Sequence, residues 1–332
     1  MMLINKPFFQ FGLVVLTVLA LPFFLRSGIM ASEILIYGMV VAASNLLLGY
    51  TGLLSFGQGI FFGAGSYLAG IVLTRTGVPV GLMLPMAAVL GTVIATLVGG
   101  FSIRRQGVYF VMLTLAFSQL FYFLAYTFSD LTGGDNGLLD LPRPTLNGVQ
   151  LVDPWSYYAY VGVCFVLVFA AMLMVTQSTF GRTLIAVREN EERAAAIGFP
   201  VRVFKIAAFA ISGAVTAFAG ALHAMLIGVA PLSSIEYHTS EIILVMTIIG
   251  GSSSLYASVL GASFYLLMAD TLSSIWPRWL LLLGLMLVVV ALFLQKGLWG
   301  LVEKVYALLT HSRVPPEVDP ANLGTDTPAK GE

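Results

Sequence analysis

The chain has 332 residues, of which 58% are hydrophobic and 10% are charged, and its 16 basic residues balance 16 acidic ones. A soluble domain is about 25% charged on average, so this chain carries too few charges to cover a water-exposed surface. The zero net charge and the lack of a basic run argue against nucleic acid as a partner. A single cysteine, Cys164, excludes an intrachain disulfide and a cysteine-based metal cluster. The composition therefore predicts an integral membrane protein whose apolar surface faces lipid.

Long apolar segments recur along the chain. Because a hydrocarbon core about 30 Å thick needs roughly 20 residues of helix, segments of this length are candidate membrane spans. The candidates lie near residues 8–25, 34–50, 58–74, 82–102, 107–127, 157–177, 205–228 and 279–295, with two shorter pieces near 241–250 and 255–271. We expect an all-α fold, a polytopic transmembrane helical bundle of about ten membrane segments.

Small residues recur at helical spacing within these spans. Gly59 and Gly63 stand four residues apart, as do Gly220, Ala224 and Gly228. Helices in lipid have no hydrophobic drive toward each other, so small residues that let two backbones approach favour their association. The spacing predicts a compact bundle.

The Lys and Arg residues of the loops predict the orientation, since short basic loops stay on the cytoplasmic side. With ten crossings that start inside, twelve basic residues fall inside and four, Arg26, Arg75, Arg143 and Arg278, fall outside. We therefore expect a multi-pass protein of the cell inner (plasma) membrane with both termini in the cytoplasm. Residues 1–310 form the expected transmembrane domain, and residues 311–332 form a polar cytoplasmic tail that we expect to be disordered.

Two segments predict helices that break inside the membrane. Residues 241–271 begin and end outside in this orientation, because the loops 229–240 and 273–278 lie there, yet the segment has only 31 residues. That is too short for two spans of about 20 residues each. Residues 34–74 make the same excursion, with a glycine-rich interruption at 49–59. Irregular backbone is tolerated at membrane depth where protein or water surrounds it, so both segments are expected to be discontinuous or re-entrant elements beside a translocation path. A glycine-rich kink or an ordinary short loop is the alternative at each break.

Uncharged polar residues at the two breaks are the candidates for this path. Hydroxyl and amide groups can replace part of a solute's hydration without trapping the solute. The alternative is that they satisfy backbone groups that are freed where the helices break. The candidates are Asn45, Thr51, Ser55 and Gln58 in the first break and Ser252 and Ser253 in the second.

The predicted cytoplasmic loop at residues 178–205 concentrates five basic and three acidic residues in a chain that is otherwise poor in charge. Arg188 with Glu192, and Glu189 with Arg193, stand four residues apart and predict ion pairs on one face of a helix.

We expect this short helix to lie at the membrane face and to dock a partner protein. The run of three alanines from Ala194 favours a helix with a surface open to close contact, and Gly198 with Pro200 is a stop signal. A loop that is merely positive on the inner side is the alternative. The candidate docking residues are Arg182, Arg188, Glu189, Glu192, Arg193 and Gly198.

Several stretches, taken in order over roughly residues 34–300, resemble one known family. They are NLLLGYTGLLSFGQ at 45–58, GVYFVMLTLAF at 107–117, TGGDNG at 132–137, GRTLIAVRE at 181–189 and AAIG at 195–198. Glu192-Arg193-Ala194 followed by Gly198 is similar to the E-A-A-x3-G coupling loop of ABC importer permeases, with Arg193 in place of the usual alanine. The ordered set resembles the LivM-type permeases of branched-chain amino acid ABC importers. One departure is the sequence GGSSS at 250–254, where that family more often has a turn of the type G-G-x-G-S.

The resemblance implies a permease subunit of an ATP-driven importer that translocates branched-chain or related amino acids delivered by a periplasmic binding protein. It also implies two cytoplasmic ABC ATPase subunits, which couple to the loop at 178–205, and a second homologous permease of the LivH type. No lysine here follows a glycine, so the phosphate-binding Gly-Lys-Ser/Thr loop is absent and we expect ATP to be bound by the partner subunits, with no cofactor in this chain. Selectivity is expected to reside in the binding protein, which leaves urea or short amides as an alternative cargo.

Other functions have weaker support in the sequence. An ion-coupled secondary transporter would place an acid or a cation site near the membrane midplane, and His223 is the one clear ionisable residue within a span. We expect His223 to bond to a neighbouring helix. His238 and His311 lack metal-ligand spacing, so no metal is expected, and no arrangement typical of a hydrolase is present. The acids that we place at outer ends of spans, where water solvates them, are Glu33, Glu241 and Asp270.

Overall fold

The computed structural model describes residues 7–302 except 77, 142–144, 147–148, 151–152, 252–253 and 294–296. Ten helices of 14 residues or more run through this part of the chain. They are α1 (Pro7–Phe24), α2 (Gly28–Asn45), α3 (Gln58–Arg75), α4 (Val80–Ser102), α5 (Val108–Thr127), α7 (Pro154–Gln177), α10 (Val201–Ile227), α11 (Tyr237–Gly250), α12 (Ala257–Ile275) and α13 (Trp279–Phe293). The predicted tail at 311–332 lies outside the described residues.

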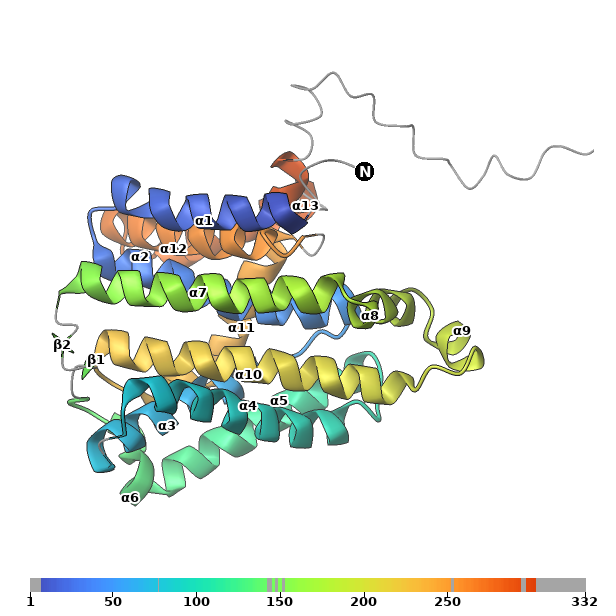
Figure 1. Ribbon diagram of the computed structural model, residues 1–332, viewed down its shortest axis with the longest axis horizontal. Coiled ribbons are helices and arrows are strands. Elements are labelled where there is room, and N and C mark those ends of the chain that lie inside the picture. The colour runs from blue at the N-terminus through green and yellow to red at the C-terminus, as the bar shows by residue number, and fades with distance from the viewer. Residues whose placement is uncertain are drawn as a thin grey trace, which may run out of the picture.

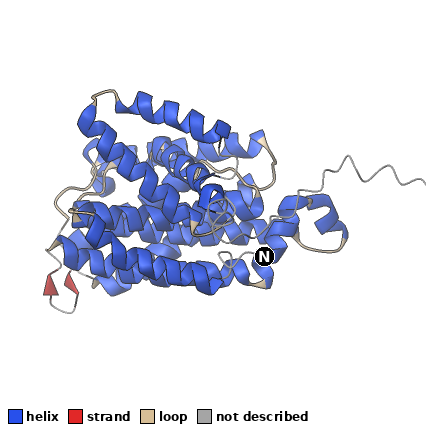
Figure 2. Cartoon of the chain, turned by 90° about the horizontal axis from the view of Figure 1, so that it is seen from above, coloured by secondary structure: helices blue, strands red, loops and turns tan. Residues whose placement is uncertain are grey.

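Short elements connect the long helices. They are the π-helix η2 (Leu46–Thr51), α6 (Ser129–Thr132), the 3-10 helix η3 (Gly134–Asn136), the strands β1 (Thr145–Leu146) and β2 (Val149–Gln150), α8 (Thr179–Glu189), α9 (Glu191–Ala196) and the 3-10 helix η4 (Leu232–Ile235). The two strands pair antiparallel, and Thr145 lies opposite Gln150. Figures 1 and 2 show α8 and α9 beyond one end of the bundle, here called the α8 end, and the strands at the opposite end, here called the hairpin end.

Six helical segments among the described residues are long and apolar enough to cross a membrane. They are 28–51, which joins α2 to η2, together with α4, α5, α7, α10 and α12. Three shorter apolar helices, at 10–24, 237–250 and 279–288, accompany them. The prediction of an all-α, polytopic membrane bundle is confirmed, while the count of ten crossings stays a prediction.

The centre of the bundle is α10, which packs most extensively against α4 and α3 and also contacts α2 (Figure 1). Glycines make these contacts close: a Cβ atom on Gly65 would lie 1.9 Å from the Ala217 carbonyl oxygen, and one on Gly220 would lie 2.0 Å from that of Phe62. Gly63 is equally confined, because its Cβ would lie 2.6 Å from the Cβ of Ile235. The close packing predicted from the small residues is confirmed, and dispersion forces between touching backbones hold the helices together.

Both predicted breaks are present. In the first, α2 gives way to η2, the chain leaves the helix at Gly52 with a φ of 72°, and α3 begins at Gln58. In the second, α11 ends at Gly250, and Gly251 turns the chain toward α12 with a φ of 100°. Positive φ favours glycine, which explains why a glycine stands at each corner.

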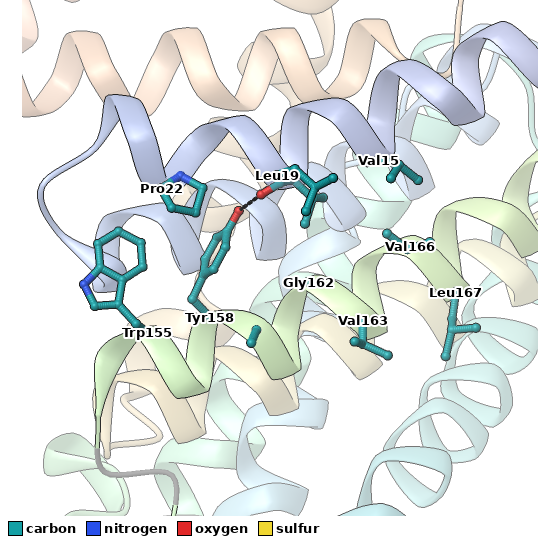
Figure 3. A pocket seen from close by; sticks show the side chains of 11 residues that line it. Val15, Leu19, Pro22, Trp155, Tyr158, Gly162, Val163, Val166 and Leu167 are labelled. Carbon is teal, nitrogen blue, oxygen red and sulfur yellow. Dashed lines mark hydrogen bonds between the residues drawn. The ribbon is translucent and has the colours of Figure 1, made fainter.

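A proline inside α1 leaves one backbone carbonyl oxygen without its helical donor, and a side chain of a neighbouring helix replaces that donor. Pro22 has no N–H and therefore cannot donate to the carbonyl oxygen of Val18, four residues earlier. The Tyr158 hydroxyl of α7 donates to that oxygen at 2.6 Å, as the dashed line in Figure 3 marks. Beside this bond an apolar groove of about 630 Å³ runs between α1 and α7, lined among others by Val15, Leu19 and Val163.

The glycine contacts predict how stability responds to one added methyl group. We expect Gly65→Ala to lower stability by about 1–3 kcal/mol, because its Cβ would overlap the backbone of α10. Gly100→Ala is the matched control within α4, since its Cβ would meet no atom within 4 Å and alanine favours a helix by about 0.5–1 kcal/mol. Thermal unfolding of the detergent-purified variants measures both changes. Equal melting temperatures for the two variants would contradict this packing.

Candidate functional site

Charge is distributed unequally between the two ends of the bundle. At the α8 end basic side chains outnumber acidic ones, whereas at the hairpin end acidic side chains outnumber basic ones. The described charged residues at the α8 end are Arg104, Arg105, Arg182, Arg188, Arg193, Arg202 and Lys205 with Glu189, Glu191 and Glu192. Those at the hairpin end are Arg26, Arg75 and Arg278 with Glu33, Asp130, Asp135, Asp140, Asp153 and Asp270.

The segment predicted to be one short helix is two helices, α8 and α9, which meet at Asn190. Asn190 has an extended backbone (φ −156°, ψ 101°), and its side-chain oxygen accepts a hydrogen bond of 2.8 Å from the backbone N–H of Arg193. Asparagine thus acts as the N-cap of α9 instead of continuing α8. The predicted pairs of Arg188 with Glu192 and of Glu189 with Arg193 are therefore wrong, since each pair spans the break, and neither is an ion pair in the described chain.

Apolar contacts fix α8 and α9 to the start of α10. Val187, Ala194 and Val201, one from each helix, form a small buried cluster. The ring of Phe204 stacks on that of Phe180 with centroids 5.5 Å apart. These contacts join all three helices into one packed unit.

Arg188 joins α8 to the end of the segment 28–51. Its guanidinium group donates a hydrogen bond to the backbone carbonyl oxygen of Gly49, within η2. The chain leaves the helix at Gly52, so the last carbonyls of η2 lack intrahelical donors, and the helix dipole places negative partial charge there. The Arg188 guanidinium supplies a hydrogen-bond donor for one of these carbonyls, and its positive charge is attracted to the negative partial charge.

An ion pair whose cation is buried joins α9 to α10. The Lys205 ammonium lies 2.5 Å from a carboxylate oxygen of Glu191, and the Lys205 side chain is only 7% exposed. Sequence reasoning placed Lys205 at the edge of a span but did not assign it a partner, because Glu191 stands 14 positions away and no helical spacing relates the two. The pair lines a cavity of about 200 Å³ together with Thr51, Gly107 and Arg188.

The remaining docking candidates face outward from α8 and α9. The side chains of Arg182, Glu189, Glu192 and Arg193 are exposed. Gly198 has a φ of 94°, and a Cβ atom there would meet open space. Apolar side chains lie exposed among these charges, notably Ile197 at 70% and Phe199 at 40%. Mixed apolar and charged surface of this kind, at one end of a membrane bundle, suits contact with another protein.

The candidate path residues of the first break are buried inside this chain. Asn45 donates to the Ser254 carbonyl oxygen at 2.9 Å, which ties the first break to the second. Gln58 donates to the Ser212 hydroxyl at 2.9 Å and accepts from Thr216 at 2.8 Å. Thr51 and Ser55 are each 4% exposed. Ser252 and Ser253 lie outside the described residues, and a role for all six in the path stays a prediction.

Helix α11 crosses the bundle at a steep angle to its neighbours (Figure 1). It starts at middle depth: the Ser240 hydroxyl accepts from the Gly59 N–H at 2.7 Å, in the first turn of α3. The adjacent Gln58 bonds to Ser212, the twelfth of the 27 residues of α10. The expectation that residues 229–240 and Glu241 lie at an outer end is therefore wrong for the start of α11. Hydropathy identifies an apolar segment, but it does not show in which direction the helix runs through the bundle.

The other two acids, Glu33 and Asp270, lie toward the hairpin end, which is the outer end in the predicted orientation. Glu33 faces inward to His223, whose Nε2 lies 3.8 Å from a Glu33 carboxylate oxygen, while the His223 Nδ1 has no partner in the described chain. This contact with α2 is longer than a hydrogen bond, so the expected hydrogen bond from His223 to a neighbouring helix stays a prediction. Within the described ranges, no three His, Cys, Asp or Glu side chains gather as metal ligands.

Residues 11–291 match a family described as "Branched-chain amino acid transport system / permease component". The chain belongs to this family. It is 28% identical over 320 residues to the high-affinity branched-chain amino acid transport system permease protein LivM of Escherichia coli (strain K12), an alignment that covers 89% of this chain and 75% of that protein. LivM of Salmonella typhimurium (strain LT2) is 27% identical over the same shares.

A more distant similarity extends beyond amino-acid permeases. The L-arabinose transport system permease protein AraH of Escherichia coli (strain K12) is 32% identical over 166 residues, which cover 49% of this chain and 47% of that protein. No solved structure matches the chain significantly. The resemblance seen in the sequence motifs is confirmed, and the relatives are permease components of transport systems.

The Glu191–Lys205 pair predicts an asymmetric response to neutralisation. Glu191→Ala leaves the ammonium of Lys205 buried without its anion, so we expect a loss of about 1–3 kcal/mol in stability. Lys205→Met leaves Glu191, which is 35% exposed and can turn to water, and is expected to cost under about 1 kcal/mol. Thermal unfolding in detergent compares the two. A larger loss for Lys205→Met would contradict the buried position of the ammonium.

Proposed function

We propose that this chain is a transmembrane permease subunit of an ATP-driven importer that translocates branched-chain or related amino acids delivered by a periplasmic binding protein. The observation that carries the proposal is the unit of α8 and α9: an exposed surface at one end of the bundle that is bonded inward to two membrane helices through Arg188 and Glu191. Membership of the permease family and the names of the LivM relatives support the cargo class.

The exposed surface of α8 and α9 also supports the proposed partners. Two cytoplasmic ATPase subunits serve the importer, and the exposed residues of α8 and α9 dock one of them. A second homologous permease completes the membrane part, and ATP binds to the ATPases. The excess of basic residues at the α8 end supports a cytoplasmic location for this end, and both termini on the same side of an inner membrane.

Coupling uses the inward contacts of α8 and α9. When ATP closes the ATPase dimer, the docked α8 and α9 move, and two attachments carry the displacement into the membrane. Arg188 pulls on the end of η2, and the Glu191–Lys205 pair pulls on the first turns of α10. Because α10 packs along α3 and α4, a shift at its start changes the arrangement of the bundle between inward and outward openings.

Uptake by reconstituted vesicles tests the function. The chain is purified with its ATPase, second permease and binding protein, and uptake of labelled leucine is followed with ATP inside or outside the vesicles. We expect uptake only when ATP, the ATPase and the binding protein are all present. Transport by this chain alone under an ion gradient would instead identify a secondary transporter and would overturn the proposal.

Substitutions on α8 and α9 test the docking surface. We expect Glu192→Lys and Gly198→Trp to lower uptake by about tenfold or more, because a reversed charge or a bulky ring separates the two proteins. The Glu192 side chain is exposed and a Cβ atom at position 198 would meet open space, so any strain from the positive φ at 198 stays local and membrane insertion is expected to persist. The matched control is Asp270→Lys at the hairpin end, where the ATPase should co-purify as with the wild type. If the ATPase also co-purifies normally with both α9-region variants and uptake is normal, α8 and α9 are not the docking surface.

A further inference from the structure

The first two turns of α11 present ionisable side chains at the middle of a membrane bundle. His238 and Glu241 lie one helical turn apart, with the His238 Nδ1 3.3 Å from a Glu241 carboxylate oxygen. Their side chains are 56% and 51% exposed, and Tyr237 beside them is 43% exposed. Their depth follows from the bond between Ser240 and the first turn of α3, which lies level with the middle of α10.

An exposed carboxylate at this depth cannot be left against lipid. A charged side chain in the hydrocarbon region costs several kcal/mol, so such residues face a protein interior or a water-filled cavity. Neither the His238 nor the Glu241 side chain is buried inside this chain, because both are exposed. The outward face of these two turns, defined by Tyr237, His238 and Glu241, therefore borders water or another subunit in the assembled protein.

The chemistry of this face fits a zwitterion. The Glu241 carboxylate is an acceptor for an ammonium group, and its single hydrogen-bond partner among the described side chains, His238, occupies one oxygen. The start of α11 adds the positive partial charge of a helix N-terminus one turn away, where the N-cap residue is Glu236 and its side chain makes no capping hydrogen bond. A carboxylate beside a helix N-terminus offers charges of opposite sign, which complement the ammonium and the carboxylate of an α-amino acid.

We propose that Tyr237, His238 and Glu241 line the solute path, and that Glu241 receives the α-ammonium group of the amino acid during translocation. The proposal rests on the proposed function as an amino-acid permease and names a residue of its path. His238 is a positioning residue that orients the carboxylate. The half-exposed carboxylate binds weakly, as release to the next position requires.

Thiol accessibility tests the path independently of the cargo. Cys164 is first replaced by alanine, and single cysteines are placed at 238 and at 163 in the assembled importer. Val163 is 61% exposed, lies near the middle of α7 and borders the apolar groove of Figure 3, so it is a control for lipid exposure at similar depth. We expect a charged, water-soluble methanethiosulfonate to modify position 238 at least about tenfold faster than position 163. Equal rates would overturn the proposal.

Neutralisation of the carboxylate tests the ammonium contact. We expect Glu241→Gln to lower leucine uptake by about tenfold, equivalent to about 1.4 kcal/mol, while ATP hydrolysis stimulated by the binding protein persists. Glu241→Asp should restore part of the uptake, since it keeps the charge, and Asp270→Asn is the control that neutralises an acid at the hairpin end without loss of uptake. Normal uptake by Glu241→Gln would overturn the proposal. Failure of the wild-type importer to move amino acids at all would instead refute the proposed function, and the accessibility of position 238 would still decide whether this face lines a path.

Discussion

The structure depends on one constraint: a backbone N–H or carbonyl group at membrane depth needs a partner inside the protein, because lipid offers none. Three places where this chain interrupts or begins a helix have such a partner. Arg188 donates to Gly49 at the end of η2, Tyr158 donates to Val18 below a proline, and Ser240 accepts from Gly59 where α3 begins. The breaks therefore determine which distant segments must touch.

The middle of the bundle is unusual because helix α11 crosses it. Helix α11 can cross between the other helices because glycines remove side chains where it passes. Gly59 and Gly63 admit residues 235–240 beside α3, and a Cβ atom on Gly261 would lie 2.2 Å from the carbonyl oxygen of Met246 on α11. A helix that starts at half depth and runs across the bundle brings polar side chains where hydropathy alone would place lipid-facing residues. This geometry is the origin of the exposed Glu241.

Hydropathy and glycine patterns predicted the membrane helices and both breaks, because span length and backbone conformation are local properties. Three features could be recognised only in the folded structure. Asn190 ends α8 because its side chain caps α9, although its neighbours all favour a continuous helix. Glu191 meets Lys205 through a turn that no helical spacing describes. The direction of α11 could not be predicted, because hydropathy places the start of an apolar segment at a membrane surface, whereas α11 starts inside the bundle. Of the site, the candidate docking residues were predicted to lie together because they are close in sequence, whereas the inward bond of Arg188 to Gly49 joins residues 139 positions apart.

The wide turn η2 has a mechanical consequence for the helix that it ends. A π turn contains one residue more than an α turn, so it can migrate along a helix by one position while only a few backbone bonds exchange acceptors. Such a migration rotates the residues it passes by about 100° and leaves the rest of the helix intact. With Arg188 attached to its last turn, the segment from Gly28 to Thr51 could thus change which side chains face its neighbours without any helix unfolding or any loop changing length.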